Sequence, residues 1–129
     1  MASPKRQKRI KRILAVDDEE VMGYVIQRIV QHLGYEVDWV PSYESAIQKI
    51  ENQEYDVILC DFRMPTMNGE HFYREIVDRN PLWAKKLVFI TGDLTSQTVA
   101  FLNEIHVPVI SKPFKIEELQ QVLEQMVSC

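Results

Sequence analysis

Short apolar runs alternate along this chain with segments of helical periodicity, and this alternation constrains the fold more than any other feature. The runs at 13–16, 57–60, 87–90 and 107–110 are rich in aliphatic and β-branched residues. Such runs are typical of strands that are buried on both faces. The segments between them repeat apolar residues every three to four positions, as helices packed on a core do. The pattern therefore predicts right-handed β-α-β units and a parallel sheet.

Residues that begin or end helices set the expected bounds. Ser42 is an expected N-cap, Gly34 an expected helix stop, and Pro81 follows the expected end of a helix. Strands are expected at 12–17, 36–40, 56–60, 86–90 and 107–110. Helices are expected at 19–33, 42–52, 69–79, 96–104 and from 116 onward. The last helix is expected to bury a stripe of Ile116, Leu119, Leu123 and Met126.

The length of 129 residues and an apolar content of 46% fit one domain with one sizeable core. Without an internal repeat, the alternation predicts a doubly wound α/β fold, a three-layer sandwich with helices on both faces of five strands. The flavodoxin-like (βα)5 topology with parallel strand order 2-1-3-4-5 is the expected one. This order sets the first and third strands side by side, and so brings Asp17 and Asp18 close to Asp61.

Positive charge is concentrated at the start of the chain. The first twelve residues hold six Lys or Arg and no acid, although the whole chain has a net charge of −4. We interpret residues 1–11 as a basic flexible N-terminal arm or linker, and residues 12–129 as the domain. A nucleic-acid contact is the alternative, but the arm has no interleaved aromatic residue, so no direct DNA binding is expected.

The remaining bulk features point to the cytoplasm. No apolar run is long enough to span a bilayer, and no signal peptide is visible. Cys60 falls in a buried strand and Cys129 ends the chain, so both are expected to be reduced thiols without a metal. A monomer or weak dimer is expected.

Polar residues that follow the strands indicate a phosphoryl-transfer site. Asp17 and Asp18 follow the first strand and Asp61 the third, whereas Thr91 and Lys112 follow the fourth and fifth. Carboxyl ends of parallel strands share one edge of a sheet, so these side chains are expected to form one pocket. Three carboxylates favour Mg²⁺, and an ammonium and a hydroxyl suit phosphoryl oxygens. Asp61 is then the expected nucleophile, forming an acyl phosphate.

From about residue 12 to residue 126, the chain resembles the receiver domain of two-component response regulators. The resemblance rests on four motifs: Asp17-Asp18, the segment DFRMPTMNG at 61–69, Thr91-Gly92, and Lys112-Pro113-Phe114. It implies a regulatory module of signal transduction that is not a conventional enzyme. A histidine kinase or histidine phosphotransfer domain would phosphorylate Asp61 in a phosphorelay.

The resemblance also implies the metal ligands. Asp18 and Asp61 would bind Mg²⁺ through their side chains, Asp17 through water, and Arg63 through its backbone carbonyl. Mn²⁺ is an acceptable substitute for Mg²⁺. The two tryptophans lie outside the four motifs, so their fluorescence is not expected to report the metal.

The resemblance assigns further positions. Thr91 and Lys112 would contact the phosphoryl group, Lys112–Pro113 would be a cis peptide bond, and Gly69 would permit close packing beside the phosphorylation loop. Many receivers carry an aromatic switch residue three positions before the lysine. Here that position is Val109, which cannot swing as a ring does, so the usual threonine–aromatic coupling is not expected.

The segments around the last two motifs are most similar to receiver modules of hybrid sensor histidine kinases, with a stand-alone receiver as the alternative. Arg63 and Asp93 are expected to face each other across the pocket mouth. An ion pair there would slow the hydrolysis of the acyl phosphate, whereas two separately solvated side chains would leave it unchanged.

The sequence fits two other kinds of protein less well than it fits a receiver domain. A phosphatase of the haloacid dehalogenase type also uses an aspartate nucleophile and Mg²⁺, but it needs a second acid two residues later, where this chain has Arg63. A flavin-binding domain of the same fold needs a Ser/Thr/Gly-rich phosphate loop after the first strand. The acidic residues 17–20 occupy that position and would repel a phosphate.

Overall fold

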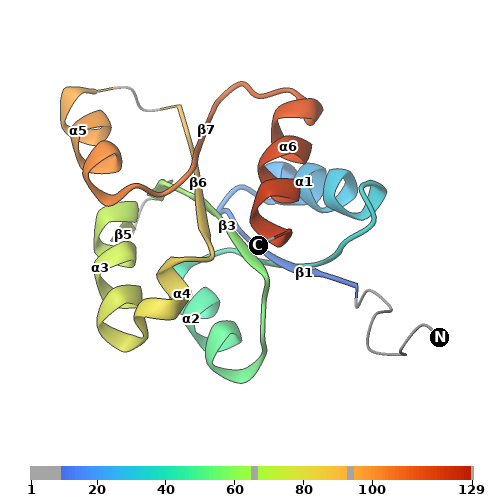
Figure 1. The fold of residues 1–129 in the computed structure, drawn as a ribbon, viewed down its shortest axis with the longest axis horizontal. Helices are drawn as coiled ribbons and strands as arrows, with labels where there is room; N and C mark the ends of the chain where they lie inside the picture. Colours follow the sequence, from blue (N-terminus) through green and yellow to red (C-terminus); the bar gives the residue numbers. More distant parts are fainter. Residues whose placement is uncertain (1–9, 65–66, 93–94, 129) are drawn as a thin grey trace.

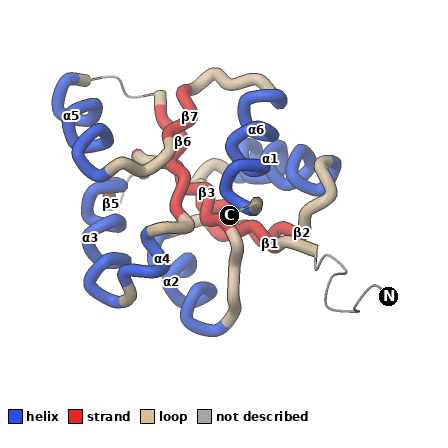
Figure 2. The backbone as a smooth tube through the Cα atoms, in the orientation of Figure 1, coloured by secondary structure: helices blue, strands red, loops and turns tan. Residues whose placement is uncertain are grey.

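A computed structural model describes residues 10–64, 67–92 and 95–128. Five parallel strands form one sheet between two layers of helices (Figures 1 and 2). The strands are β1 (Arg12–Val16), β2 (Glu36–Val40), β3 (Val57–Asp61), β6 (Leu87–Thr91) and β7 (Val109–Ser111). Their order across the sheet is β2-β1-β3-β6-β7. This confirms the expected doubly wound fold, with the five sheet strands in the order 2-1-3-4-5.

In the described part of the chain, six helices cover the sheet. They are α1 (Glu20–His32), α2 (Tyr43–Asn52), α3 (Gly69–Arg79), α4 (Pro81–Ala84), α5 (Ser96–Ile105) and α6 (Ile116–Val127). Helices α1 and α6 lie on one face, and α2, α3 and α5 on the other (Figure 1). On β1, Ile13 packs toward the first layer and Leu14 toward the second. Since successive side chains of a strand point to opposite faces, burial on both faces explains the unbroken apolar runs.

The expected helix signals are confirmed. The side chain of Ser42 accepts a hydrogen bond from the Ser45 N–H at the start of α2. Gly34 follows α1 with a φ of 97°, a conformation that glycine adopts without a steric penalty. Helix α3 ends at Arg79, directly before Asn80.

Several expected bounds were wrong by one or two residues. Strands β3 and β6 each run one residue further than expected, so Asp61 and Thr91 are the last residues of their strands. The last strand is shorter than expected and begins at Val109. Pro108 has no N–H to donate to the ladder, although its carbonyl accepts a hydrogen bond from Phe89.

The sequence did not reveal two small elements. A two-stranded hairpin, β4 (Arg63–Met64) and β5 (Met67–Asn68), follows β3. The short helix α4 begins at Pro81, and the side chain of Asn80 accepts a hydrogen bond from the Leu82 N–H at its start. An Asn-Pro pair can end one helix and begin the next, and only the helix end was predicted here.

The expected buried stripe of α6 was wrong at its first position. Leu119 and Leu123 are fully buried, but Ile116 is 50% exposed. Ile116 is the first residue of the helix and is not among the residues packed in the core beside α1, whereas the later turns are. Its exposure adds to an apolar surface that includes Val25 on α1.

Candidate functional site

Asp61 lies at the carboxyl end of β3, in the middle of the sheet. Its side chain is 9% exposed, and both carboxylate oxygens have partners. Oδ2 accepts a hydrogen bond from the Lys112 ammonium over 3.2 Å, and Oδ1 accepts one from the Arg63 backbone N–H over 3.2 Å. The carboxylate is therefore held at the pocket floor beside a positive charge.

Asp17 comes directly after β1 and is more deeply buried than the other site residues, at 1% exposure. Its Oδ1 accepts a hydrogen bond from the Glu19 N–H over 2.9 Å. Burial raises the pKa of this carboxyl to about 6; the Glu19 N–H opposes the rise, the nearby Asp61 adds to it, and Lys112 opposes it more weakly. Removing the carboxylate from water thus outweighs the hydrogen bond that stabilises its charged form.

The three expected carboxylates meet at this edge. One oxygen from each of Asp17, Asp18 and Asp61 lies within 4.8 Å of the other two. Asp18 is exposed and lines an open depression of about 840 Å³. Carboxylate oxygens at such spacing are the ligands that hard divalent cations prefer, and the exposed side leaves room for water and phosphoryl oxygens. The donor set therefore fits Mg²⁺.

The hydroxyl and the amine that the sequence predicted are at the same edge. Thr91 ends β6 and lines the depression together with Lys112, whose side chain is 24% exposed. The Lys112 N–H donates to the Thr91 carbonyl over 2.9 Å, which ties the two segments together. The peptide bond between Lys112 and Pro113 is cis, as the resemblance implied.

Gly69 allows the close packing that the resemblance implied. Its N–H donates to the Phe62 carbonyl over 2.6 Å. A Cβ at this position would lie 2.3 Å from the Phe62 ring and 2.8 Å from the Phe62 carbonyl oxygen. Any side chain here would therefore displace the residue that follows Asp61.

Sequence reasoning missed two aromatic residues that hold the main chain of the acidic residues. The Trp39 indole N–H donates to the Asp17 carbonyl over 2.9 Å, and the Tyr43 hydroxyl donates to the Asp61 carbonyl over 2.7 Å. Burial raises the pKa of Tyr43, so its hydroxyl remains a donor. No local motif marks either residue, because each reaches the site from a neighbouring element of the fold.

The remaining candidate positions lie near the pocket. Val109 is 37% exposed on β7. Arg63 is exposed and lines the depression, whereas Asp93 lies outside the described residues. The pairing of Arg63 with Asp93 therefore stays a prediction.

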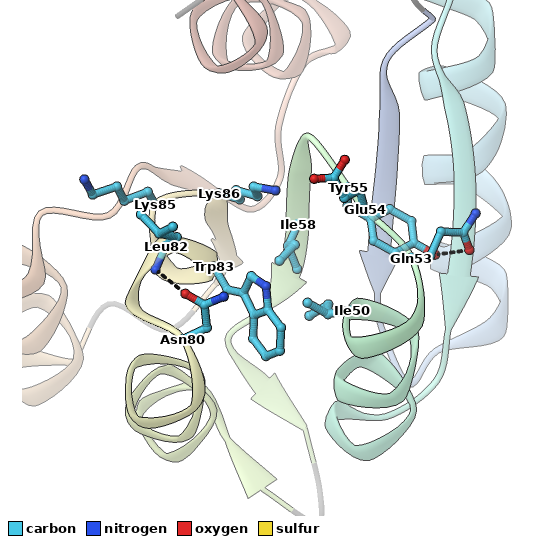
Figure 3. Close-up of a pocket in the computed structure, with 10 residues that line it drawn as sticks. All are labelled: Ile50, Gln53, Glu54, Tyr55, Ile58, Asn80, Leu82, Trp83, Lys85 and Lys86. Carbon is cyan, nitrogen blue, oxygen red and sulfur yellow. Dashed lines mark hydrogen bonds between the residues drawn. The ribbon is translucent and has the colours of Figure 1, made fainter.

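A second cavity, of about 410 Å³, lies at the opposite end of the sheet, between α2 and α4 (Figure 3). It is lined by Ile50, Gln53, Glu54, Tyr55, Ile58, Asn80, Leu82, Trp83, Lys85 and Lys86. Tyr55 and Lys86 precede β3 and β6, so the cavity adjoins the amino ends of strands whose carboxyl ends carry the acidic cluster. None of the clustered carboxylates lines it.

Comparison with known proteins agrees with this geometry. The response regulator receiver domain family matches residues 13–124. The chain therefore belongs to the response regulator receiver domain family, whose members are phosphoryl-accepting regulatory modules of two-component signalling and not conventional enzymes. Membership implies a histidine kinase partner.

Curated relatives include receivers in different settings. The chain is 28% identical over 114 residues to the aerobic respiration control sensor protein ArcB of Escherichia coli, covering 88% of this chain and 15% of ArcB. It is 29% identical over 121 residues to the response regulator receiver protein CpdR of Brucella abortus, covering 91% of this chain and 97% of CpdR. The chain thus spans a small part of the sensor protein ArcB and nearly all of the receiver protein CpdR.

One solved structure with the same fold contains a bound ligand. The response regulator TrrA of Thermotoga maritima, in complex with Mg²⁺ and BeF, has a TM-score of 0.78 and 27% identity, covering 91% of this chain and 99% of TrrA.

Within the described residues, no helix is both long and apolar enough to cross a bilayer.

Proposed function

We propose that this domain accepts a phosphoryl group from a phosphohistidine onto Asp61, with Mg²⁺ held by Asp17, Asp18, Asp61 and the Arg63 carbonyl. The observation that carries the proposal is the joint placement of three carboxylates within 4.8 Å and an ammonium 3.2 Å from Asp61 Oδ2. Mg²⁺ bound there supplies positive charge that screens the carboxylates and the phosphoryl oxygens. Mn²⁺, which also prefers oxygen ligands, substitutes for it.

The residues of the chain have separate tasks in the transfer. An oxygen of Asp61 forms a bond to phosphorus while the P–N bond of the donor breaks, and the electron pair of that bond stays on the imidazole nitrogen. The Lys112 ammonium, already beside Oδ2, attracts the equatorial oxygens of the moving group. The Thr91 hydroxyl donates to another of these oxygens.

A small phosphodonor tests the proposal directly. With MgCl₂ and acetyl phosphate, the domain is expected to gain one phosphoryl group that hydroxylamine removes, because an acyl phosphate reacts with that nucleophile. Intact-mass spectrometry measures the gain. Labelling of the same extent in excess chelator would contradict a role for the metal.

An apolar surface beside the pocket supports a docking partner that carries the phosphohistidine. It consists of exposed Val21, Tyr24 and Val25 on α1 and of Ile116 at the start of α6. A hollow of about 400 Å³ between these segments is also lined by Lys112 and Pro113, so the surface adjoins the site. A partner whose histidine reaches Asp61 would also cover this apolar surface. Exposed apolar surface of this kind is often buried by protein partners.

Val25→Glu tests the docking surface. Val25 and Val99 are each 40% exposed, but Val99 lies on α5, on the other face of the sheet. An autophosphorylated histidine kinase that labels the wild type is expected to label Val25→Glu at least tenfold more slowly and Val99→Glu at the wild-type rate, because only the first change sets a charge in the buried interface. Both variants are expected to react with acetyl phosphate like the wild type. Equal slowing of both variants by the kinase would discard the surface.

The cellular compartment, the oligomeric state and the phosphodonor of the domain are part of the proposal. We propose that it works in the cytoplasm, where the buried Cys60 stays a free thiol, and as a monomer or weak dimer without direct DNA binding. A histidine phosphotransfer domain is an equally suitable donor, since its phosphohistidine presents the same chemistry. A module of a hybrid kinase and a stand-alone receiver both remain consistent with the relatives.

A further inference from the structure

Trp39 lies on β2, outside all four motifs, and yet its indole reaches the acidic loop. The Nε1–H donates to the main-chain carbonyl of Asp17 over 2.9 Å. The ring is partly buried against the layer formed by α1 and α6. The Trp39 N–H therefore binds the loop that carries two candidate metal ligands. Packing of the ring in the core does not by itself require this contact.

We propose that Trp39 is a positioning residue for the divalent-cation site, because it fixes the peptide plane that joins Asp17 to Asp18. This inference rests on the proposed function. The Asp17 carbonyl is part of that rigid plane, and the plane sets the direction in which the exposed Asp18 side chain leaves the backbone. The Asp17 N–H donates to the Val40 carbonyl over 3.1 Å, so β2 holds both polar groups of this backbone residue.

Gly23 on α1 leaves the space that the indole occupies. A Cβ at Gly23 would lie 2.3 Å from Nε1 and 2.6 Å from Cε2 of Trp39. Glycine weakens a helix interior relative to alanine, so its place in α1 has a structural reason in this close approach. A side chain at this position would displace the ring and with it the nitrogen that donates to the Asp17 carbonyl.

A fixed Asp18 matters for the affinity of the site. A ligand side chain that already lies in its binding geometry loses less conformational freedom when the cation arrives. Groups that stand behind metal ligands and orient them typically change metal affinity by ten- to a hundredfold when they are removed. The indole acts through the backbone and not on a ligand atom, so the lower end of that range applies.

Trp39→Phe tests the role, since it removes the donor and keeps an aromatic ring on β2. Mg²⁺ is expected to bind this variant about tenfold more weakly than the wild type, as measured by calorimetric titration of metal-free protein with MgCl₂. The matched control is Trp83→Phe, which changes the other tryptophan, in the cavity at the far end of the sheet (Figure 3). This control is expected to bind Mg²⁺ like the wild type.

A spectroscopic readout separates positioning from simple packing. In the Trp83→Phe protein, Trp39 is the single tryptophan, and its indole N–H gives one resonance in a nitrogen-15 spectrum. This resonance is expected to shift as MgCl₂ is added, with the midpoint that calorimetry gives, because the cation polarises the acidic loop to which the N–H is bonded. The fluorescence of Trp39 is expected to follow the same titration.

The Mg²⁺ affinity of Trp39→Phe decides whether Trp39 positions the cation site. Equal Mg²⁺ affinity of the wild type and folded Trp39→Phe would overturn the positioning role and leave the proposed function intact. If Trp39→Phe does not fold, the indole resonance decides alone, and a signal that stays fixed at saturating Mg²⁺ overturns the role. Absence of Mg²⁺ binding by the wild type would remove the proposed function together with this inference.

Discussion

Asp61→Asn is expected to accept no phosphoryl group from acetyl phosphate, whereas the wild type gains one. The substitution keeps the size of the side chain and an oxygen that can accept the Arg63 N–H, which lies 3.2 Å from Oδ1 in the wild type. It removes the carboxylate, and a neutral amide oxygen is a far weaker nucleophile toward phosphorus. Intact-mass spectrometry after incubation with MgCl₂ measures the difference.

The control for this experiment is a second aspartate beside the same strand. Asp56 precedes β3 and accepts a hydrogen bond from the Arg12 N–H, at the opposite end of the sheet from the pocket. Asp56→Asn is expected to be labelled like the wild type. Equal labelling of Asp61→Asn and the wild type would refute the assignment of Asp61, and loss of labelling in both variants would point to a general structural effect.

Asp17→Asn is expected to raise the free energy of unfolding of the metal-free protein at pH 7 by about 1–3 kcal/mol. Burial raises the pKa of Asp17 from 3.8 to about 6, and this difference corresponds to about 3 kcal/mol. The folded state therefore binds the proton more tightly than the unfolded state, and the wild type loses stability as the pH rises from about 4 to about 6. The asparagine carries no charge, and its Oδ1 still accepts the Glu19 N–H.

The pH dependence supplies the test. Urea unfolding in excess chelator is expected to show the gain above pH 6 and little of it at pH 4, where the wild-type carboxyl is protonated in the folded state. Asp78→Asn, which changes an exposed aspartate on α3, is expected to alter stability by no more than about 0.5 kcal/mol at either pH. A gain that persists undiminished at pH 4 would show that the charge of Asp17 is not its cause.

Magnesium is expected to stabilise the wild type more than it stabilises Asp17→Asn. A cation that binds only the folded state stabilises it by mass action, and the wild type has one more negative charge in the cluster than Asp17→Asn. Saturating MgCl₂ is therefore expected to raise the stability of the wild type more than that of the variant. The same carboxylate thus lowers stability without the metal and raises metal affinity.

Local patterns were sufficient to predict which polar residues meet at one edge of the sheet, because each of them lies where a buried strand ends. Asp61, Thr91 and Lys112 come at or just after the carboxyl ends of β3, β6 and β7. In a parallel sheet these ends share one edge, so the order of the strands alone brings distant residues together. The sequence also showed that Val109 replaces the aromatic switch residue of many receivers, since this position lies three residues before the motif lysine.

The partners of those residues could not be predicted in the same way. The hydrogen bond from Trp39 to Asp17 spans 22 positions, and the one from Tyr43 to Asp61 spans 18. The two residues of each pair lie in or directly after different elements, so the periodicity of a single helix or strand does not link them. The expectation that tryptophan fluorescence does not report the metal rested on the motifs alone, and the Trp39 contact predicts the opposite result.

The order of the five sheet strands, the doubly wound sheet and the polar groups at its edge could be predicted from the sequence, because apolar periodicity and strand ends are local properties. The folded structure was needed to find the raised pKa of Asp17, the contact of Trp39 with the acidic loop and the exposed apolar surface around Ile116. Burial and main-chain contacts depend on which elements pack against each other across the sheet. That information is distributed over the whole chain and appears only when the layers assemble.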